Sequence, residues 1–234
     1  MYDKMYDNAN IRKENEEFVK FVRPFLAKDK LVVDLGCGTC RKVIKMAHAV
    51  KSVAAVDRNI AMLRQAKKSL KKAGTTNVVL YLGDNLNAPF FSHTFDVCTS
   101  ALSTWNPAEV HRLLKPDGYF FIETLAPDDK FEVKQAFGND EFGPRGYLFQ
   151  QTVEERELYL KTSLEPFFEI EDMQYAKQTT TLFLKGFVQL LMVTPTIRGF
   201  SRVKDKGIID GLTNNGVVSF TEKRIMIRAK AKKI

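Results

Sequence analysis

The sequence predicts an α/β fold, in which a parallel sheet carries helices on both faces. Three observations support this fold class. A buried β-branched run, Leu31–Leu35, is followed by two glycines one residue apart and then by an amphipathic stretch. Further apolar runs alternate with helical patterns at the spacing that parallel strands and crossover helices require. The second run ends in the carboxylate of Asp57, at the edge of the sheet where such folds bind ligands.

The N-terminal half repeats this strand and helix pattern with few interruptions. A helix is expected within residues 1–28, because Phe18, Phe21 and Phe25 lie on one apolar face. Gly74 is a stop signal for a later helix. The expected strands of this half are 31–35, 52–57, 77–82, 95–100 and 119–124, and the expected helices are 41–50, 60–73 and 107–114.

The regular alternation of strand and helix patterns ends after Leu125. Residues 126–151 contain several glycines and prolines among charges and are expected to be irregular. Thr152 and Glu155 have the spacing of a capping box, which predicts that a helix begins there. The further expected elements are helices over 152–164 and 181–193, the latter stopping before Pro195, and strands over 167–175 and 217–229.

Composition indicates one globular domain. Of the 234 residues, 44% are apolar and 27% are charged, which is ordinary for a chain with a packed core. There is no run of about 18 apolar residues, so no membrane span is expected, and the N-terminal segment lacks the apolar core of a signal peptide. Three cysteines argue against a disulfide framework and favour a reducing, cytoplasmic location. The net charge of +8 is compatible with an anionic partner such as RNA.

The glycine loop indicates the class of cofactor. A dinucleotide site needs a third glycine where this chain has Arg41. A nucleoside triphosphate site needs a Gly-Lys-Ser/Thr run, which this sequence lacks. Asp34, just before the glycines, would repel phosphate but would attract a ligand that carries an ammonium group near a cationic centre. S-adenosylmethionine has this charge pattern. Asp57 stands where a strand-end acid meets ribose hydroxyls, although an Asp there is also typical of a cap on the next helix.

Five segments, in order, resemble the motifs of the class I S-adenosylmethionine-dependent methyltransferases. The resemblance covers roughly Leu31 to Thr124 and implies a Rossmann-like, mostly parallel sheet of seven strands, whose antiparallel strand residues 217–229 would supply. Cys40 departs from the family pattern, which often has glycine there. The segments are residues 33–39, 56–59 with Met62 and Leu63, 83–86 with Pro89 and Phe90, 95–97, and 113–118.

The resemblance also implies roles for individual residues. Asp34 and Gly36 would hold the methionine end of S-adenosylmethionine, and Asp57 its ribose hydroxyls. Arg58 and Met62 would flank the adenine, Asp84 and Asn85 would bond its amino edge, and Ser100 would face the methionine or the acceptor. The implied cofactor-binding set is Asp34, Leu35, Gly36, Cys37, Gly38, Asp57, Arg58, Met62, Asp84, Asn85, Leu86 and Ser100.

The expected organisation is a single methyltransferase domain over residues 1–234 with lid insertions in its C-terminal half. Its expected parts are an N-terminal helix (1–28), a cofactor-binding core (29–125), a lid and substrate region with the sixth strand (126–216), and a last strand with a basic tail (217–234).

The methyl acceptor stays open between two classes. A small metabolite is favoured by the apolar lid, and RNA by the net charge. Residues 187–195 are also similar to a segment of the bacterial ribosomal RNA guanine-N1 methyltransferases, although those enzymes begin with a zinc-binding module of clustered cysteines that this sequence lacks. The alternative function is that of a non-catalytic regulatory protein that binds S-adenosylmethionine. Arg41 disfavours a nicotinamide dehydrogenase.

No metal site or catalytic base is assigned, and the oligomeric state is left open. Cys37 and Cys40 form a Cys-x-x-Cys, but Cys98 is the other cysteine and no histidine pair has ligand spacing, so no metal is expected. Trp105, Asn106 and Glu123 are expected on the active face. Methyl transfer needs little besides alignment, because the sulfonium is already activated.

Overall fold

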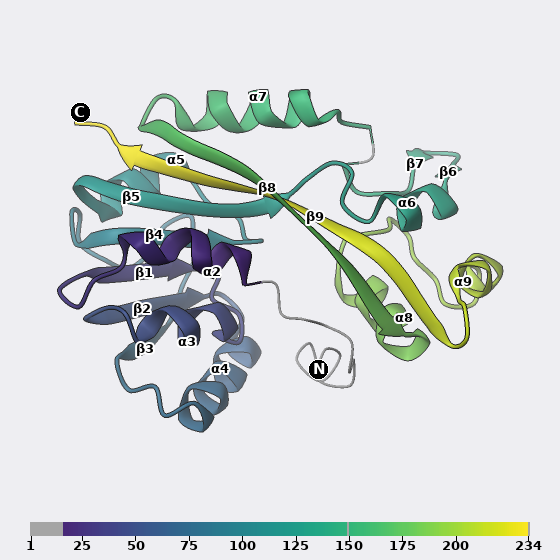
Figure 1. The fold of residues 1–234 in the computed structure, drawn as a ribbon, viewed down its shortest axis with the longest axis horizontal. Helices are drawn as coiled ribbons and strands as arrows, with labels where there is room; N and C mark the ends of the chain where they lie inside the picture. Colours follow the sequence, from purple (N-terminus) through teal and green to yellow (C-terminus); the bar gives the residue numbers. More distant parts are fainter. Residues whose placement is uncertain (1–15, 149, 234) are drawn as a thin grey trace. The chain divides into compact units, whose positions relative to one another are not determined.

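A computed structural model describes residues 16–148 and 150–233 of the chain. Its main feature is a seven-stranded sheet in the order β3-β2-β1-β4-β5-β9-β8 (Figure 1). This confirms the predicted α/β, Rossmann-like, mostly parallel sheet. The seven strands are β1 (Leu31–Leu35), β2 (Ser52–Asp57), β3 (Val78–Leu82), β4 (Phe95–Ala101), β5 (Leu114–Leu125), β8 (Phe168–Phe183) and β9 (Val217–Ala231). A separate two-stranded ribbon consists of β6 (Asn139–Asp140) and β7 (Gly143–Pro144). The helical elements are α2 (Glu17–Val22), η1 (Arg23–Phe25), α3 (Arg41–Ala47), α4 (Ile60–Lys72), α5 (Pro107–Leu113), α6 (Phe131–Phe137), α7 (Val153–Leu164), α8 (Leu184–Val193) and α9 (Lys206–Leu212).

Strand β1 lies in the middle of the parallel part of the sheet. It pairs with β2 from Leu31↔Ser52 to Leu35↔Val56, and with β4 on its other side. Val32, Val33 and Leu35 are fully buried, as expected for a strand covered on both faces. The carboxyl ends of β1, β2 and β4 therefore lie side by side, which is where ligands bind in this kind of sheet.

Strands β8 and β9 form a long antiparallel pair. The Lys232 N–H donates to the Phe167 carbonyl, while the hydroxyls of Thr181 and Ser219 lie 2.8 Å apart. Residue numbers thus rise along β8 as they fall along β9, and the arrowheads of the two strands point in opposite directions (Figure 1). β9 supplies the antiparallel strand expected over 217–229.

The chain forms two compact units. The core unit comprises Glu16–Thr124, Leu158–Tyr175 and the last strand segment from Ile225, and the insertion unit comprises Leu125–Glu157 and Ala176–Arg224. The insertion unit has an apolar core of its own, which includes Val133, Phe137, Leu182, Phe187 and Phe220. The expectation that the whole chain is a single folding domain stays a prediction.

The elements of the core unit agree with the predicted ones to within five residues, the largest difference being that β5 begins at Leu114 rather than at residue 119. The strand expected over 167–175 continues as β8 into the insertion unit and ends at Phe183, and the insertion unit differs in three further places. Residues 126–151, expected to be irregular, contain α6 and the β6–β7 ribbon. The helix expected over 181–193 begins at Leu184, because residues 181–183 extend β8. Helix α9 was not expected. The capping box is confirmed: the Thr152 N–H donates to Glu155 Oε2 at 2.8 Å, and the Glu155 N–H to Thr152 Oγ1 at 3.1 Å.

Within the described residues, no helix combines the length and apolar character that a membrane span requires.

Candidate functional site

The loop after β1 begins with a glycine that no other residue can replace without a rearrangement. Gly36 has φ +82°. Its N–H and that of Cys37 both donate to the Val56 carbonyl at 2.9 Å, which folds the chain over the end of β2. A Cβ at Gly36 would lie 2.0 Å from Ser103 Oγ. Both the backbone angle and the close approach require glycine here.

The second glycine of the loop is bonded to the carboxylate at the end of β2. Gly38 has φ +52°, and its N–H donates to Asp57 Oδ2 at 2.8 Å. A Cβ at Gly38 would meet no described atom within 4 Å, so this glycine borders open space. Asp57 Oδ1 accepts the Asn59 N–H at 2.8 Å, and it is Asn59, rather than Asp57, that caps α4. Asp57 is thereby fixed on the loop, with carboxylate lone pairs left for a ligand.

Cys40 takes the left-handed conformation at the start of α3, with φ 63°. This angle explains why a glycine suits the position, and it places the buried thiol near Cys37. The hydrogen bond with Cys40, together with burial, raises the pKa of the Cys37 thiol well above its usual range, so nucleophilic chemistry at Cys37 is disfavoured. No group of three or more potential metal ligands occurs among the residues that the structure describes.

Asp34 is a buried carboxylate at the end of β1. It lies opposite Thr99 of β4, whose hydroxyl donates to Asp34 Oδ1 at 2.5 Å. Burial raises the pKa of Asp34 to about 6, while the Thr99 hydrogen bond and the positive charge of Lys42 oppose that rise. Lys42, in the first turn of α3, is in turn ion-paired with the buried Glu123.

Two buried polar atoms beside the loop have no hydrogen-bond partner among the described residues: Asn85 Oδ1 and Ser100 Oγ. Asn85 follows β3, and its amide nitrogen donates to Ser103 Oγ at 2.7 Å, which directs this side chain toward Gly36. Ser100 lies at the end of β4. Buried groups of this kind are nearly always satisfied, so these two atoms suit a ligand with polar groups of its own.

The remaining residues of the predicted cofactor-binding set differ in how far they are exposed. Arg58, Asp84 and Leu86 are exposed at the ends of β2 and β3, and Met62 is half-buried on α4. The Asp84 carboxylate accepts the Leu86 N–H at 3.0 Å and so shapes the turn after β3. The side chain of Leu35 is buried within the sheet.

The three residues expected on the active face have partners within the protein. Trp105 packs edge-on against Phe120 with ring centroids 5.6 Å apart, Asn106 caps α5 by accepting the Ala108 N–H, and Glu123 pairs with Lys42. None of them is placed as a catalytic base by these contacts.

Sequence reasoning missed Lys42, Thr99 and Ser103. All three are brought to the site by contacts between segments far apart in the chain. Thr99 could have been found from the sheet register, because neighbouring parallel strands place the residue near the end of β4 beside Asp34.

The arrangement fits S-adenosylmethionine. Asp34 offers a negative charge at the end of β1, and Asp57 offers acceptor positions beside open space at Gly38. The two unpartnered atoms belong to Asn85, which follows β3, and to Ser100, at the end of β4. The charges match a ligand with cationic groups and hydroxyls better than one with phosphates.

Comparison with known proteins leads to the same family. Residues 32–118 match the family model described as a methyltransferase domain. A demethylmenaquinone methyltransferase of Geobacillus sp. is 30% identical over 140 residues, 54% of this chain and 59% of that protein. The biotin biosynthesis bifunctional protein BioHC of Teredinibacter turnerae is 32% identical over 121 residues, 45% of this chain and 21% of that protein.

A crystal structure from Bacillus halodurans, assigned as a methyltransferase, has the same fold with a TM-score of 0.67 at 18% identity, over 92% of this chain and 99% of that chain. The chain thus spans between a fifth and three-fifths of the length of these two curated relatives. Residues 32–118 thus match a methyltransferase domain, and the order of the motifs and of the strands is that of the class I S-adenosylmethionine-dependent methyltransferase fold.

Proposed function

We propose that this protein transfers a methyl group from S-adenosylmethionine to a small organic acceptor. The observation that carries the proposal is the loop itself: Gly36 at a position that admits no side chain, and Gly38 bonded to Asp57 beside open space. This arrangement leaves bare backbone and a fixed carboxylate for a cofactor.

The proposed roles follow from charge and position. Asp34 attracts the cationic methionine end, Asp57 accepts the ribose hydroxyls, and Asn85 accepts a hydrogen bond through its unpartnered oxygen. Arg58, Met62, Asp84 and Leu86 border the adenine. When bound, S-adenosylmethionine supplies a methyl group on a positively charged sulfur. With the cofactor held by these residues, an electron pair of the acceptor would form the bond to the methyl carbon, and the electron pair of the carbon–sulfur bond would stay on sulfur.

A small acceptor is supported by the curated relatives, whose names refer to demethylmenaquinone and to biotin biosynthesis. The net charge of +8 favours RNA instead, but charge alone identifies no partner. Alignment of acceptor and methyl group supplies most of the rate gain, roughly 7–11 kcal/mol for a well-oriented pair, so no general base is required by the proposal.

Cofactor binding is tested by calorimetry with purified protein and S-adenosylmethionine. Asp57→Ala should weaken binding by about tenfold or more, as expected when a charged hydrogen bond worth roughly 1.5–3 kcal/mol is lost. Asp29→Ala is the matched control, because the Asp29 side chain is 77% exposed and lies outside the loop. Equal affinities for the two variants would refute the assigned site, provided that both melt cooperatively.

Turnover is tested by incubating the protein and labelled S-adenosylmethionine with a cell extract that is then separated into RNA, protein and low-mass fractions. The proposal expects label in the low-mass fraction. Label in RNA that is sensitive to ribonuclease and reduced by salt would transfer the assignment to an RNA methyltransferase. Tight binding of S-adenosylmethionine without label in any fraction would indicate a regulatory protein.

A further inference from the structure

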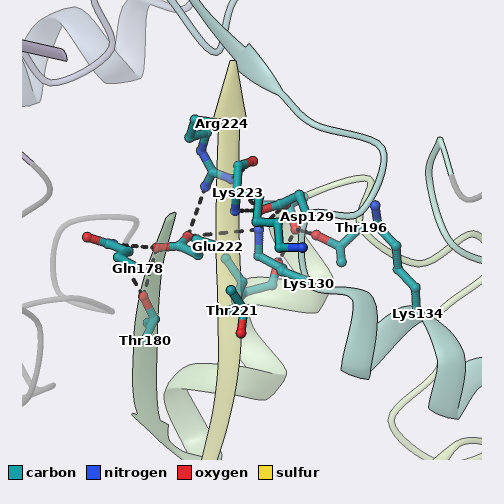
Figure 2. Close-up of polar contacts among 12 residues, drawn as sticks. Asp129, Lys130, Lys134, Gln178, Thr180, Thr196, Thr221, Glu222, Lys223 and Arg224 are labelled. Atoms are coloured by element: carbon teal, nitrogen blue, oxygen red, sulfur yellow. Dashed lines mark hydrogen bonds and ion pairs between the residues drawn. The ribbon is translucent and has the colours of Figure 1, made fainter. Parts of the chain in front are cut away.

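Buried polar side chains in the two units differ in whether their hydrogen-bonding atoms are used. In the insertion unit, Asp129 is paired with Lys130 and Arg224 (Figure 2). Glu222 is paired with the same two cations, so the opposite charges satisfy one another. In the core unit, Asn85 is only 9% exposed, yet its Oδ1 has no hydrogen-bond partner among the described residues. The atom that asks for an explanation is therefore the Asn85 oxygen.

The orientation of the Asn85 amide follows from its two partners. Its Nδ2 donates to Ser103 Oγ at 2.7 Å and, at 3.4 Å, to the Thr104 carbonyl. A carbonyl oxygen can only accept, so the nitrogen of the amide must lie on this side. The short bond to the Ser103 hydroxyl holds it there. The Asn85 oxygen is thus left as a fixed acceptor for a ligand that donates a hydrogen bond.

Ser103 itself is held in place by the backbone around it. The residue before it, Leu102, has φ 56°, and the Leu102 N–H donates to the Glu123 carbonyl at 2.8 Å. The left-handed conformation is unfavourable for leucine, and the side chain is 47% exposed, so little burial compensates for it. A Cβ at Gly36 would lie 2.0 Å from Ser103 Oγ, so the hydroxyl lies directly against the loop after β1. Backbone strain at such a place is typical of a residue that must be positioned exactly where it is.

We propose that Ser103 is a positioning residue that holds the Asn85 amide with its oxygen toward the cofactor, so that the site selects a cofactor group that donates a hydrogen bond. The inference rests on the proposed function for the identity of the cofactor, whereas the orientation of the amide is a property of the free protein. S-adenosylmethionine has two N–H donors of this kind, the amino group of its adenine and the ammonium group of its methionine part. A rotated amide would present its own N–H groups to these donors, so the preference for them depends on the Ser103 hydroxyl.

The orientation is tested first in the free protein, by NMR of the Asn85 side-chain amide in 15N-labelled protein. Its N–H protons should exchange with water about twofold to tenfold faster in Ser103→Ala, the effect of losing one hydrogen bond. Ser69→Ala is the matched control, because Ser69 is a half-buried serine of the core unit whose hydroxyl donates to the Gln65 carbonyl within α4. Exchange at the wild-type rate in Ser103→Ala would overturn the proposal.

Selectivity is measured by calorimetry with S-adenosylhomocysteine, which keeps both donors, and with two analogues that each lack one of them. S-inosylhomocysteine has a carbonyl oxygen in place of the adenine amino group, and 5′-methylthioadenosine lacks the ammonium group. Ser103→Ala should reduce the preference for S-adenosylhomocysteine over one of these analogues by about twofold to tenfold. The analogue affected identifies the donor that Asn85 binds. A loss of stability alone would weaken all three ligands alike, so an unchanged preference over both analogues would count against the positioning role.

Two further comparisons show whether Ser103 acts through Asn85. In an Asn85→Leu background, Ser103→Ala should not change the preference further, because the amide on which the hydroxyl acts is gone. An additive effect in this background would contradict the proposal. Leu102→Gly should keep the wild-type preference, since glycine adopts positive φ readily, whereas the β-branched side chain of Leu102→Val disfavours this angle and should reduce the preference by moving Ser103.

The two proposals fail separately. Binding of S-adenosylhomocysteine with a preference that does not depend on Ser103 would overturn the positioning role and leave the cofactor assignment standing. An Asn85 amide whose exchange depends on Ser103, in a protein that binds none of the three ligands, would overturn the cofactor assignment and leave the amide orientation standing. If Ser103→Ala does not fold, equal preferences in Leu102→Gly and Leu102→Val would overturn the proposal instead.

Discussion

Gly36→Ala should mainly lower the stability of the protein, whereas Gly38→Ala should mainly lower its affinity for the cofactor, although the two glycines are separated by a single residue. Both have positive φ, and an alanine in this region costs about 1–2 kcal/mol at either position. At Gly36 the new methyl group would also lie 2.0 Å from Ser103 Oγ and 2.4 Å from Ser103 Cβ. Overpacking of this kind adds about 1–3 kcal/mol. We expect Gly36→Ala to lower the free energy of unfolding by roughly 2–5 kcal/mol, against roughly 1–2 kcal/mol for Gly38→Ala.

The loss of affinity for S-adenosylmethionine should be larger for Gly38→Ala than for Gly36→Ala, the reverse of the order in stability. The methyl group of Gly38→Ala would enter the open space assigned to the cofactor, so this variant should lose affinity for S-adenosylmethionine while remaining folded. Urea unfolding and calorimetry measure the two quantities. The double variant Gly36→Ala/Ser103→Gly isolates the steric part, because removal of Ser103 Cβ and Oγ should restore about 1–3 kcal/mol of stability. Equal destabilisation by both alanines, or no rescue by Ser103→Gly, would refute the close-approach argument.

Three further predictions concern charge and capping. The pKa of Asp34 is about 6 in the folded protein, against an ordinary value of 3.8, so the native state binds a proton more tightly than the unfolded state does. The free energy of unfolding should therefore fall by about 3 kcal/mol as the pH rises through this window. Urea unfolding of Asp34→Asn between pH 3 and 8 should show no such fall. S-adenosylmethionine affinity should rise over the same range, since the ionised carboxylate attracts the cation. Lys42→Met should shift this rise in S-adenosylmethionine affinity to higher pH, because the positive charge of Lys42 lowers the pKa of Asp34. If calorimetric titrations show the rise at the same pH in this variant, the role given to Asp34 is wrong. Thr152→Ala should cost about 1 kcal/mol of unfolding free energy by removing the α7 cap, and Ser163→Ala, within the same helix, serves as its control.

The cofactor loop could be predicted because its determinants are local. A buried strand, two glycines and a strand-end acid occupy positions 31–38 and 57, and their roles follow from residue type and spacing. The pairing of Lys42 with Glu123 joins residues 81 positions apart, and it depends on the tertiary structure that brings the first turn of α3 to a side chain near the end of β5. Sequence periodicity contains no information on that tertiary structure.

The insertion unit was harder to predict for a different reason. Helix α6 is seven residues long, and its apolar anchors Val133 and Phe137 span too few turns to produce a clear helical period. Residues 176–183 of β8 are rich in polar residues and threonines, so their strand character comes from pairing with β9 and from contacts such as Thr180 with Glu222. Tertiary partners, rather than local propensity, decide both elements.

The continuity of β8 and β9 through both units affects how this protein can be divided. The boundaries between the units at residues 175/176 and 224/225 fall inside these two strands, so the chain passes from one unit to the other there within regular secondary structure. The segment that matches the family model ends at residue 118, and β9 is the neighbour of β5 in the sheet. An excised fragment over residues 32–118 would lack this neighbour and would present an open strand edge, the kind of surface that recruits other chains into aggregates. The segment over residues 32–118 is therefore recognisable in the sequence, but it is not expected to be stable as an isolated fragment.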